Sequence, residues 1–312
     1  MRILLYIGVL LFAVGLYFPA QAQPPLWQDN FGGELTDLTG CDDCVEAIAL
    51  PFPFPFNGST FDMAYVGTNG CIQLGGLGLD DDIDFDYWIE MQDFLSDSDP
   101  DNPLICPVET DWDLEEIGAI YYNDSGNPLI ITWDGVGTNE NEVIPSTFQI
   151  LLYQNGRIVF NYNGMIVGGD FIDDLDGGIV AGVTPSDFPF DDEVFVPGDP
   201  GPVDLNQGPF DFGSTVYERW CFDVANSCGV DDNDTGLPGP INTAFDLDLW
   251  SICYFPNQGG FFITSGFEGN LNFTCEAFIT DIPTLSEWGL IAMAGILGIV
   301  GFMVLRRRKV TA

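Results

Sequence analysis

Aspartates are grouped at short spacing in several parts of this sequence. One group comprises Asp80, Asp82, Asp84 and Asp86, and a second comprises Asp173, Asp174 and Asp176. Similar acidic runs span residues 97–101 and 231–234. Hard cations such as calcium take about six to eight oxygen ligands, and carboxylates on turns supply them. The named aspartates are therefore candidate calcium ligands, and calcium is a candidate cofactor.

The alternative to specific calcium binding is a solvated acidic face. The helical calcium-binding loop needs acidic side chains at its first and last places. Asp174 and Asp176 fit the third and fifth places of such a loop. Its first place would then fall on Ile172 and its twelfth on Val183, and neither carries a carboxylate. The sequence leaves both interpretations open.

Several catalytic chemistries are excluded by residues that the chain lacks. It has no histidine, which removes Ser-His-Asp and Cys-His nucleophiles and His-containing zinc sites. Its single lysine, Lys309, lies close to the C-terminus. A glycan hydrolase needs only two carboxylates, but with so many acids a suitable pair arises by chance. We predict that the chain is not an enzyme, with a carboxylate-based extracellular glycan hydrolase as the alternative.

The N-terminal residues predict export. Residues 1–22 combine Arg2, an apolar centre and a final Ala-Gln-Ala, which is the pattern of a cleaved signal peptide. Of the 48 acidic residues, 47 lie in residues 23–281, together with only two of the seven bases, so this region carries a formal net charge of −45. Nucleic-acid binding is excluded, since it depends on cations that neutralise phosphates.

All the cysteines lie in the region expected to be exported. They are Cys41, Cys44, Cys71, Cys106, Cys221, Cys228, Cys253 and Cys275. An even number of cysteines outside the cytoplasm favours disulfides, although sequence alone does not fix their pairing. Local pairs, Cys221 with Cys228 and Cys253 with Cys275, are our expectation. The acids between Cys41 and Cys44 would raise the thiol pKa values, so we expect a structural role there.

Short apolar runs separated by glycine and proline turns predict an all-β fold, an antiparallel sandwich or a barrel. Strands are expected at residues 45–50, 61–66, 71–74, 117–122, 129–133, 147–162 (a hairpin), 179–183 and 215–224. Alternating prolines in residues 51–56 predict an edge segment with its phenylalanines on one side. A two-residue turn at Asn155-Gly156 would place Leu151 opposite Phe160.

The remaining segments complete the predicted domain organisation. Residues 23–40 are expected to be a loosely held lead-in to a β domain that extends to residue 225. Residues 79–107 are interpreted as an acidic surface insertion, and residues 226–244 as a linker. Residues 245–281 are expected to form a small, disulfide-held β segment.

Strand and turn sequences in residues 50–187 resemble a known family. The pieces are LPFPFPFNG at 50–58, VGTNGCI at 66–72, ITW at 131–133, TFQILLY at 147–153, GRIVFNY at 156–162 and AGVT at 181–184. Their order resembles the nidogen-like (NIDO) extracellular domain. The resemblance implies a β-rich module of matrix and adhesion proteins, and it offers no catalytic residues. The acidic insertion departs from the family pattern, which puts a shared binding surface in doubt.

The C-terminal residues 282–312 have three parts in a fixed order. The first is Ile282, Pro283, Thr284, Leu285, Ser286, Glu287, Trp288 and Gly289. An uncharged run at 288–305 would form a transmembrane helix, and the basic residues 306–309 would hold its end in the cytoplasm. This order resembles the IPTL-CTERM sorting signal of Gram-negative bacteria, which implies an exosortase-type sorting peptidase as a partner. A plain membrane anchor is the alternative.

These observations together predict an exported protein at the cell surface or outside the cell. It would be anchored in the inner membrane at least transiently, through its C-terminal helix. The expected function is adhesin-like binding or scaffolding in the extracellular matrix, with a polysaccharide or surface protein as partner. A self-assembling structural coat or matrix subunit is a further alternative.

Overall fold

The computed structural model describes residues 23–75, 103–138, 141–165, 179–184, 203–212, 215–220, 245–257, 260–270 and 272–275. These residues belong to one compact unit, which ends at Cys275. They form antiparallel β-sheets and one short 3₁₀ turn, η1 (Leu205–Gln207), which confirms the all-β prediction. No helix within these ranges is long and apolar enough to span a bilayer. The predicted signal peptide and the predicted transmembrane helix lie outside them.

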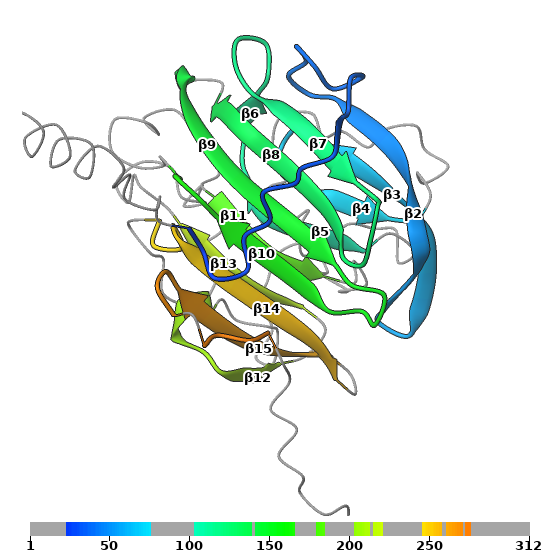
Figure 1. The fold of residues 1–312 in the computed structure, drawn as a ribbon, viewed down its shortest axis with the longest axis vertical. Coiled ribbons are helices and arrows are strands. Elements are labelled where there is room, and N and C mark those ends of the chain that lie inside the picture. The colour runs from blue at the N-terminus through cyan, green and yellow to red at the C-terminus, as the bar shows by residue number, and fades with distance from the viewer. Residues whose placement is uncertain are drawn as a thin grey trace, which may run out of the picture. The chain divides into compact units, whose positions relative to one another are not determined.

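The larger sheet has nine strands (Figure 1). In order across the sheet they are β1 (Gly33–Glu34), β7 (Ala119–Asn123), β8 (Leu129–Thr138), β9 (Asn141–Leu152), β10 (Ile158–Tyr162), β14 (Trp250–Asn257), β15 (Gly260–Phe267) and β12 (Phe210–Phe212), while β6 (Trp112–Asp113) pairs with β8 off this path. The smaller sheet runs in the order β13 (Val216–Trp220), β11 (Ile179–Thr184), β5 (Leu104–Glu109), β4 (Ile72–Leu74), β3 (Ser59–Gly67) and β2 (Val45–Phe56).

Both sheets contribute side chains to one continuous core, so the architecture is a sandwich. Trp133 of β8 stacks on Phe148 of β9, with ring centroids 5.0 Å apart. From the smaller sheet, Phe54 is fully buried in the same core. The indole nitrogen of Trp133 also donates to the carbonyl oxygen of Gly67, which links the two sheets directly.

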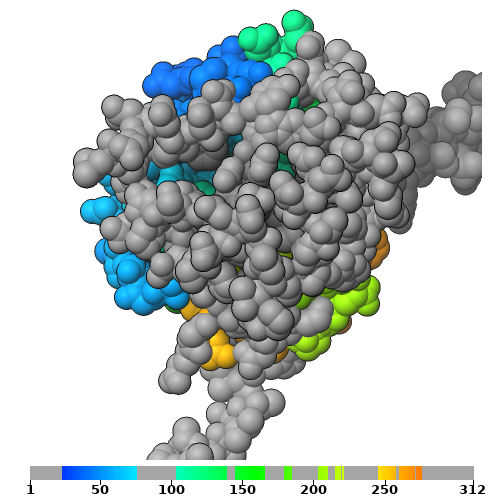
Figure 2. All heavy atoms as spheres, turned by 180° about the vertical axis from the view of Figure 1, so that it is seen from behind, coloured from blue at the N-terminus to red at the C-terminus, as the bar shows by residue number. Residues whose placement is uncertain are grey.

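The proline-rich strand β2 is the edge of the smaller sheet, as predicted. Phe52, Phe54 and Phe56 are buried, while the alternating prolines face outward or are partly covered. Pairing with β3 is interrupted by a register shift between Ala49 and Phe54. Proline has no N–H to donate, so this irregular edge is a poor template for pairing with other chains. Seen from the opposite side, residues of β2 and β3 and residues 203–212 lie at two margins of the described surface (Figure 2).

The predicted register of the β9–β10 hairpin is wrong by one residue. Phe160 lies opposite Ile150, whereas the sequence predicted Leu151. The loop is longer than a two-residue turn, because Tyr153 N–H donates to the Arg157 carbonyl oxygen and Gly156 N–H donates to that of Tyr153. Gly156 has φ +85°, the left-handed conformation of a three-residue loop with a bulge. This bulge places Leu151 and Phe160 on opposite faces of the sheet.

Two predicted boundaries are also corrected. Residues 104–107 were assigned to the acidic insertion, but they begin β5, a fully buried strand. The segment 245–281 is predicted to be a small, disulfide-held β segment; the β14–β15 hairpin and the Cys253–Cys275 disulfide agree with this as far as Cys275, but β14 also pairs along β10, so the hairpin is part of the larger sheet. In both places, apolar side chains are buried in the sandwich core, which decides the assignment.

Residues 23–31 are not a loosely held lead-in. They lie across the outer face of the larger sheet, with a turn at Pro25-Leu26, and are drawn in dark blue in Figure 1. Backbone atoms of Leu26 and Gln28 bond to side chains of β9, β10 and β14. We call residues 24–31 the N-terminal strap.

Three disulfides are present in the described residues: Cys41–Cys44, Cys71–Cys106 and Cys253–Cys275. The Cys253–Cys275 pair confirms one of the expected pairings. Cys221 and Cys228 lie outside the described residues. Cys253 and Cys275 join a second apolar cluster on the outer face of the larger sheet, which explains why the β9–β10 pair is apolar on both faces.

Candidate cation centre

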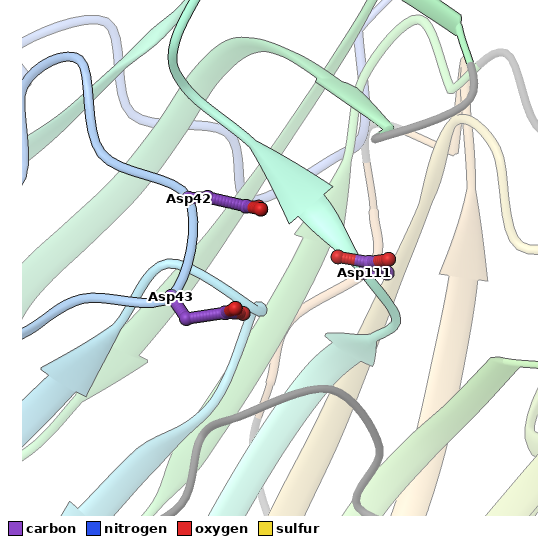
Figure 3. Close-up of side chains that lie close together, drawn as sticks. All are labelled: Asp42, Asp43 and Asp111. Carbon is purple, nitrogen blue, oxygen red and sulfur yellow. The ribbon is translucent and has the colours of Figure 1, made fainter.

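Three aspartates from two separate loops meet at one end of the sandwich. Asp42 and Asp43 lie between the disulfide-bonded Cys41 and Cys44, and Asp111 lies in the bend between β5 and β6. One carboxylate oxygen of each aspartate lies within 4.8 Å of the others. Figure 3 shows the carboxylates of Asp42 and Asp43 extending from their loop towards the segment that carries Asp111. We call these three residues the aspartate triad.

The loop that carries two of these aspartates is held from both ends. The Cys41–Cys44 disulfide closes it into a short ring. Thr68, in the β3–β4 turn, has its hydroxyl 3.0 Å from the Cys44 nitrogen and accepts a hydrogen bond from it. The Cys44 carbonyl oxygen in turn accepts from the Thr68 N–H at 2.9 Å. The loop is therefore fixed against the smaller sheet.

Asn69 connects the two loops. Its Nδ2 donates to Asp43 Oδ1 at 3.0 Å, and its Oδ1 accepts from the Trp112 N–H at 3.0 Å. Its backbone carbonyl oxygen accepts from the Thr110 N–H at 3.3 Å. Asn69 is only 5% exposed, and its side-chain bond with Trp112 is buried, while its bond to Asp43 is partly buried. One buried side chain thus fixes Asp43 relative to the segment that carries Asp111.

The next residue, Gly70, must be glycine at this point of contact. Its φ is +84°, and a Cβ there would lie 1.9 Å from the Val108 carbonyl oxygen. That oxygen also accepts a hydrogen bond from the Trp112 indole nitrogen at 3.0 Å. The turn can approach β5 closely only without a side chain.

Electrostatics at the triad disfavour its full ionisation. Burial, followed by the charges of Asp43 and Asp111, raises the pKa of the Asp42 carboxyl from 3.8 to about 7. The charges of Asp113 and Glu115 contribute smaller parts of this rise. Asp42 Oδ1 is buried and has no hydrogen-bond partner in the described structure. A cation here would oppose each of these effects, because it stabilises the ionised carboxylates.

The chemistry of these residues suits a hard cation. Three carboxylates can each supply one oxygen, and calcium completes its coordination with water or carbonyl oxygens. Magnesium needs a more regular octahedral arrangement and keeps more of its water. The donor set contains no nitrogen or sulfur ligand, so softer metals have no preferred partner here.

A second acidic group lies near η1. Asp204, Glu218 and Asp246 bring carboxylate oxygens within 4.8 Å of one another. Glu218 is buried, and its Oε2 accepts from the Leu205 N–H at 2.7 Å. Asp246 accepts from the Trp220 indole nitrogen at 3.2 Å. These donors already serve two of the three carboxylates. Burial, followed by the charge of Asp246, raises the pKa of the third, Asp204, whose Oδ1 is buried without a hydrogen-bond partner, so this group is a second candidate for a cation.

The predicted calcium ligands do not coincide with the triad. The candidates at residues 80–86 and 173–176 lie outside the described residues, as do the sorting residues 282–289. The sequence does not indicate the complete triad, because Asp111 lies far along the chain from Asp42 and Asp43. A detectable signal was present, since a Cys-Asp-Asp-Cys disulfide ring fixes two carboxylates side by side.

Comparison with known proteins identifies two parts of the chain. Residues 20–179, slightly more than half of its length, match the family described as NIDO related. Residues 282–308 match the IPTL-CTERM motif. No curated protein and no solved structure gave a significant match. The triad and its supporting turn lie inside the first matched region. With a β-sandwich in that region and both predicted resemblances confirmed, the chain belongs to the NIDO-related family and carries an IPTL-CTERM motif.

Proposed function

We propose that this protein is sorted to the cell surface, where its β-sandwich binds or scaffolds components of the extracellular matrix. The observation that carries the proposal is the presence of a NIDO-related domain and an IPTL-CTERM motif in one chain. An exosortase-type peptidase would process the motif near residues 282–288. The strongly acidic exported region supports partners that are polysaccharides or proteins bridged by cations, and it argues against polyanions.

Calcium is the proposed stabilising cation. The aspartate triad supports this, because its carboxylates are close together and the charge on Asp42 is disfavoured without a counter-ion. Calcium would hold the Cys41–Cys44 loop against the β5–β6 bend. Any partner that binds this end of the sandwich would then bind in a calcium-dependent way.

Binding to matrix extracted from the producing cells tests the proposed function. Mature protein retained on immobilised matrix in calcium, and released by a chelator, is the expected result. Asp42→Asn should reduce this retention, while Asp62→Asn, at an exposed position of β3, should not. Absence of retention in calcium would contradict the binding function.

The same experiment separates the alternatives. Self-association in calcium without any matrix would favour a coat or matrix subunit. Release of sugar reducing ends from the matrix would favour a hydrolase, provided that a single Asp→Asn change abolishes it.

A further inference from the structure

A row of polar side chains crosses the larger sheet beneath the N-terminal strap. Thr132, Gln149, Asn161 and Ser251 occupy neighbouring register positions on β8, β9, β10 and β14. All of them are fully buried, although each could instead have been an apolar residue of the sheet face. We call these residues the polar row.

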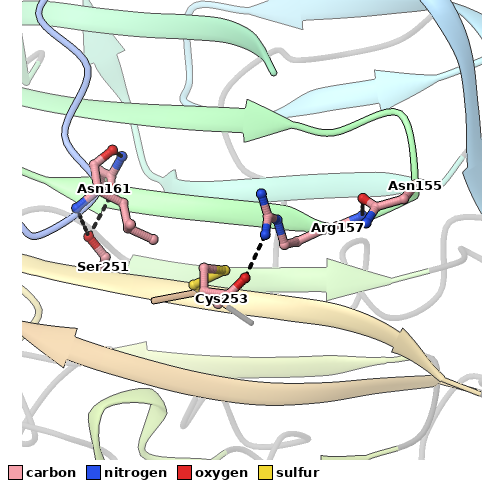
Figure 4. Close-up of a disulfide and its surroundings, with 7 residues drawn as sticks. Asn155, Arg157, Asn161, Ser251 and Cys253 are labelled. Carbon is pink, nitrogen blue, oxygen red and sulfur yellow. Dashed lines mark hydrogen bonds between the residues drawn. A yellow bond between two sulfur atoms is a disulfide. The ribbon is translucent and has the colours of Figure 1, made fainter. Parts of the chain in front are cut away.

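The polar row satisfies both backbone groups of Leu26. The Leu26 N–H donates to Ser251 Oγ at 3.1 Å, and its carbonyl oxygen accepts from Asn161 Nδ2 at 3.1 Å. Ser251 Oγ in turn donates to Asn161 Oδ1 at 2.6 Å, which orients both side chains (Figure 4). Ser251 therefore accepts a hydrogen bond from the backbone of Leu26, and Asn161 donates one to it.

Gln149 repeats this arrangement two residues further along the strap. Its Oε1 accepts from the Gln28 N–H at 3.2 Å, and its Nε2 donates to the Gln28 carbonyl oxygen at 2.8 Å. A bond of 3.0 Å from Nε2 to Thr132 Oγ1 fixes the amide orientation. Leu26, at the end of a turn closed by a bond from the Trp27 N–H to the Pro24 carbonyl oxygen, and Gln28 thus each exchange N–H and C=O bonds with side chains of the sheet.

These hydrogen bonds recognise backbone groups of the strap and not its side chains. Beside the two bonded backbone units, the Leu26 side chain packs against the outer cluster around Cys253, and further along the strap the Phe31 ring contacts Tyr121 of β7. The strap enters no sheet ladder of its own, since the first paired strand after it is β1. The strap therefore binds the polar row as a separate peptide would bind to the face of a sheet, through side chains of the sheet and not through strand pairing.

We propose that the polar row is a binding site for a polypeptide segment that presents the backbone N–H and C=O groups of two residues two positions apart, with an apolar side chain on the first. The chain fills this site with its own N-terminal strap, and the strap of a second copy can fill it when the first is absent. The strap lies at the free end of the mature chain predicted from the sequence, so exchange requires no threading through the fold.

Hydrogen exchange of the mature protein is the first test. The strap should detach without unfolding of the sheet, so the amides of residues 26–31 should exchange faster than those of β9 and β10. Gln149→Met keeps the approximate shape of the side chain but removes its hydrogen bonds, and it should speed exchange of the strap about tenfold or more. Gln73→Met, at a buried position of β4 in the other sheet, is the matched control and should leave the strap unchanged. Exchange of the strap only together with β9 and β10 would overturn the proposal.

Addition of the strap as a separate peptide is the second test. Mature protein should bind an excess of a labelled peptide of residues 23–31 saturably and at one site, as the peptide replaces the native strap. Methylation of the backbone nitrogens of Leu26 and Gln28 should weaken binding about tenfold or more. A Gln28→Ala peptide keeps both backbone groups and should bind within about threefold of the original. Equal binding of the methylated peptide, or no binding by a folded acceptor, would contradict recognition of the main chain.

Discussion

Arg157 donates a hydrogen bond from Nη1 to the carbonyl oxygen of Cys275, at 2.5 Å and across 118 positions of sequence. The same guanidinium lies 3.6 Å from the centroid of the Tyr153 ring. The contact therefore ties the end of the compact unit to the β9–β10 hairpin. The Cys253–Cys275 disulfide, which lies nearby in Figure 4, fastens the same end to β14.

Arg157→Met should lower the free energy of unfolding by about 1–3 kcal/mol, because it removes a charge-assisted hydrogen bond and a cation–π contact. Arg157→Lys should be intermediate, since it keeps the charge but loses the planar guanidinium. Chemical denaturation of both variants checks this. Equal losses from the two would contradict a specific role for the guanidinium.

Removal of the Cys253–Cys275 disulfide should also lower the free energy of unfolding. A Cys253→Ser, Cys275→Ser variant loses a crosslink that closes a loop of 22 positions, and we expect a loss of about 2–4 kcal/mol. Proteolysis should then cut first near residues 268–275, ahead of the core strands. Unchanged stability with unchanged cleavage would show that Arg157 and packing suffice to hold this segment.

The raised pKa of Asp42 gives a pH dependence with a definite sign. The folded protein holds this proton up to a pH of about 7, whereas the unfolded chain releases it near 3.8. The protonated carboxyl therefore favours the folded state at low pH, and this contribution is lost as the pH rises from about 4 to about 7. Tm measured in chelator should fall across this range, and Asp42→Asn should reduce the fall.

Calcium should reverse that effect where Asp42 is ionised. At pH 8 millimolar calcium should raise the Tm of the native protein, and at pH 4 it should have little effect. Asp42→Asn should have the higher Tm in chelator and a weaker response to calcium. An equal rise with sodium at matched ionic strength would mean general screening, and the triad would then have no specific role.

Gly70→Ala should destabilise the protein by about 2 kcal/mol or more, because φ is positive and the new Cβ would meet the Val108 carbonyl oxygen. The calcium response should weaken too, since Asn69 next to it aligns the triad. Gly33→Ala, where a Cβ has open space, is the control and should be nearly neutral. Comparable losses from both would argue against the close approach at Gly70.

Local patterns predicted much of the fold. Alternation in residues 51–56 correctly placed Phe52, Phe54 and Phe56 in the core and the strand at an edge, because period two is a property of any strand. The hairpin register failed, since Asn-Gly suits both a two-residue turn and the observed loop with Gly156 as a bulge. Local sequence does not choose between them.

The sites depend on contacts that no local pattern encodes. Asp43 and Asp111 are far apart in the chain and are brought together by Asn69, which bonds to Asp43 and to Trp112, the residue after Asp111. Gln149 and Asn161 interrupt apolar strands, but their role follows only from the strap that crosses them. The strap itself lacks strand alternation, which is why it resembled a loose lead-in.

Intact mass and location of the native protein test the central claim most directly. The account predicts a product that begins at Gln23, ends near residues 282–288 and is found at the cell surface or in the medium. A product that ends at Ala312 in the inner membrane would contradict sorting and would leave the sandwich as a membrane-anchored periplasmic domain.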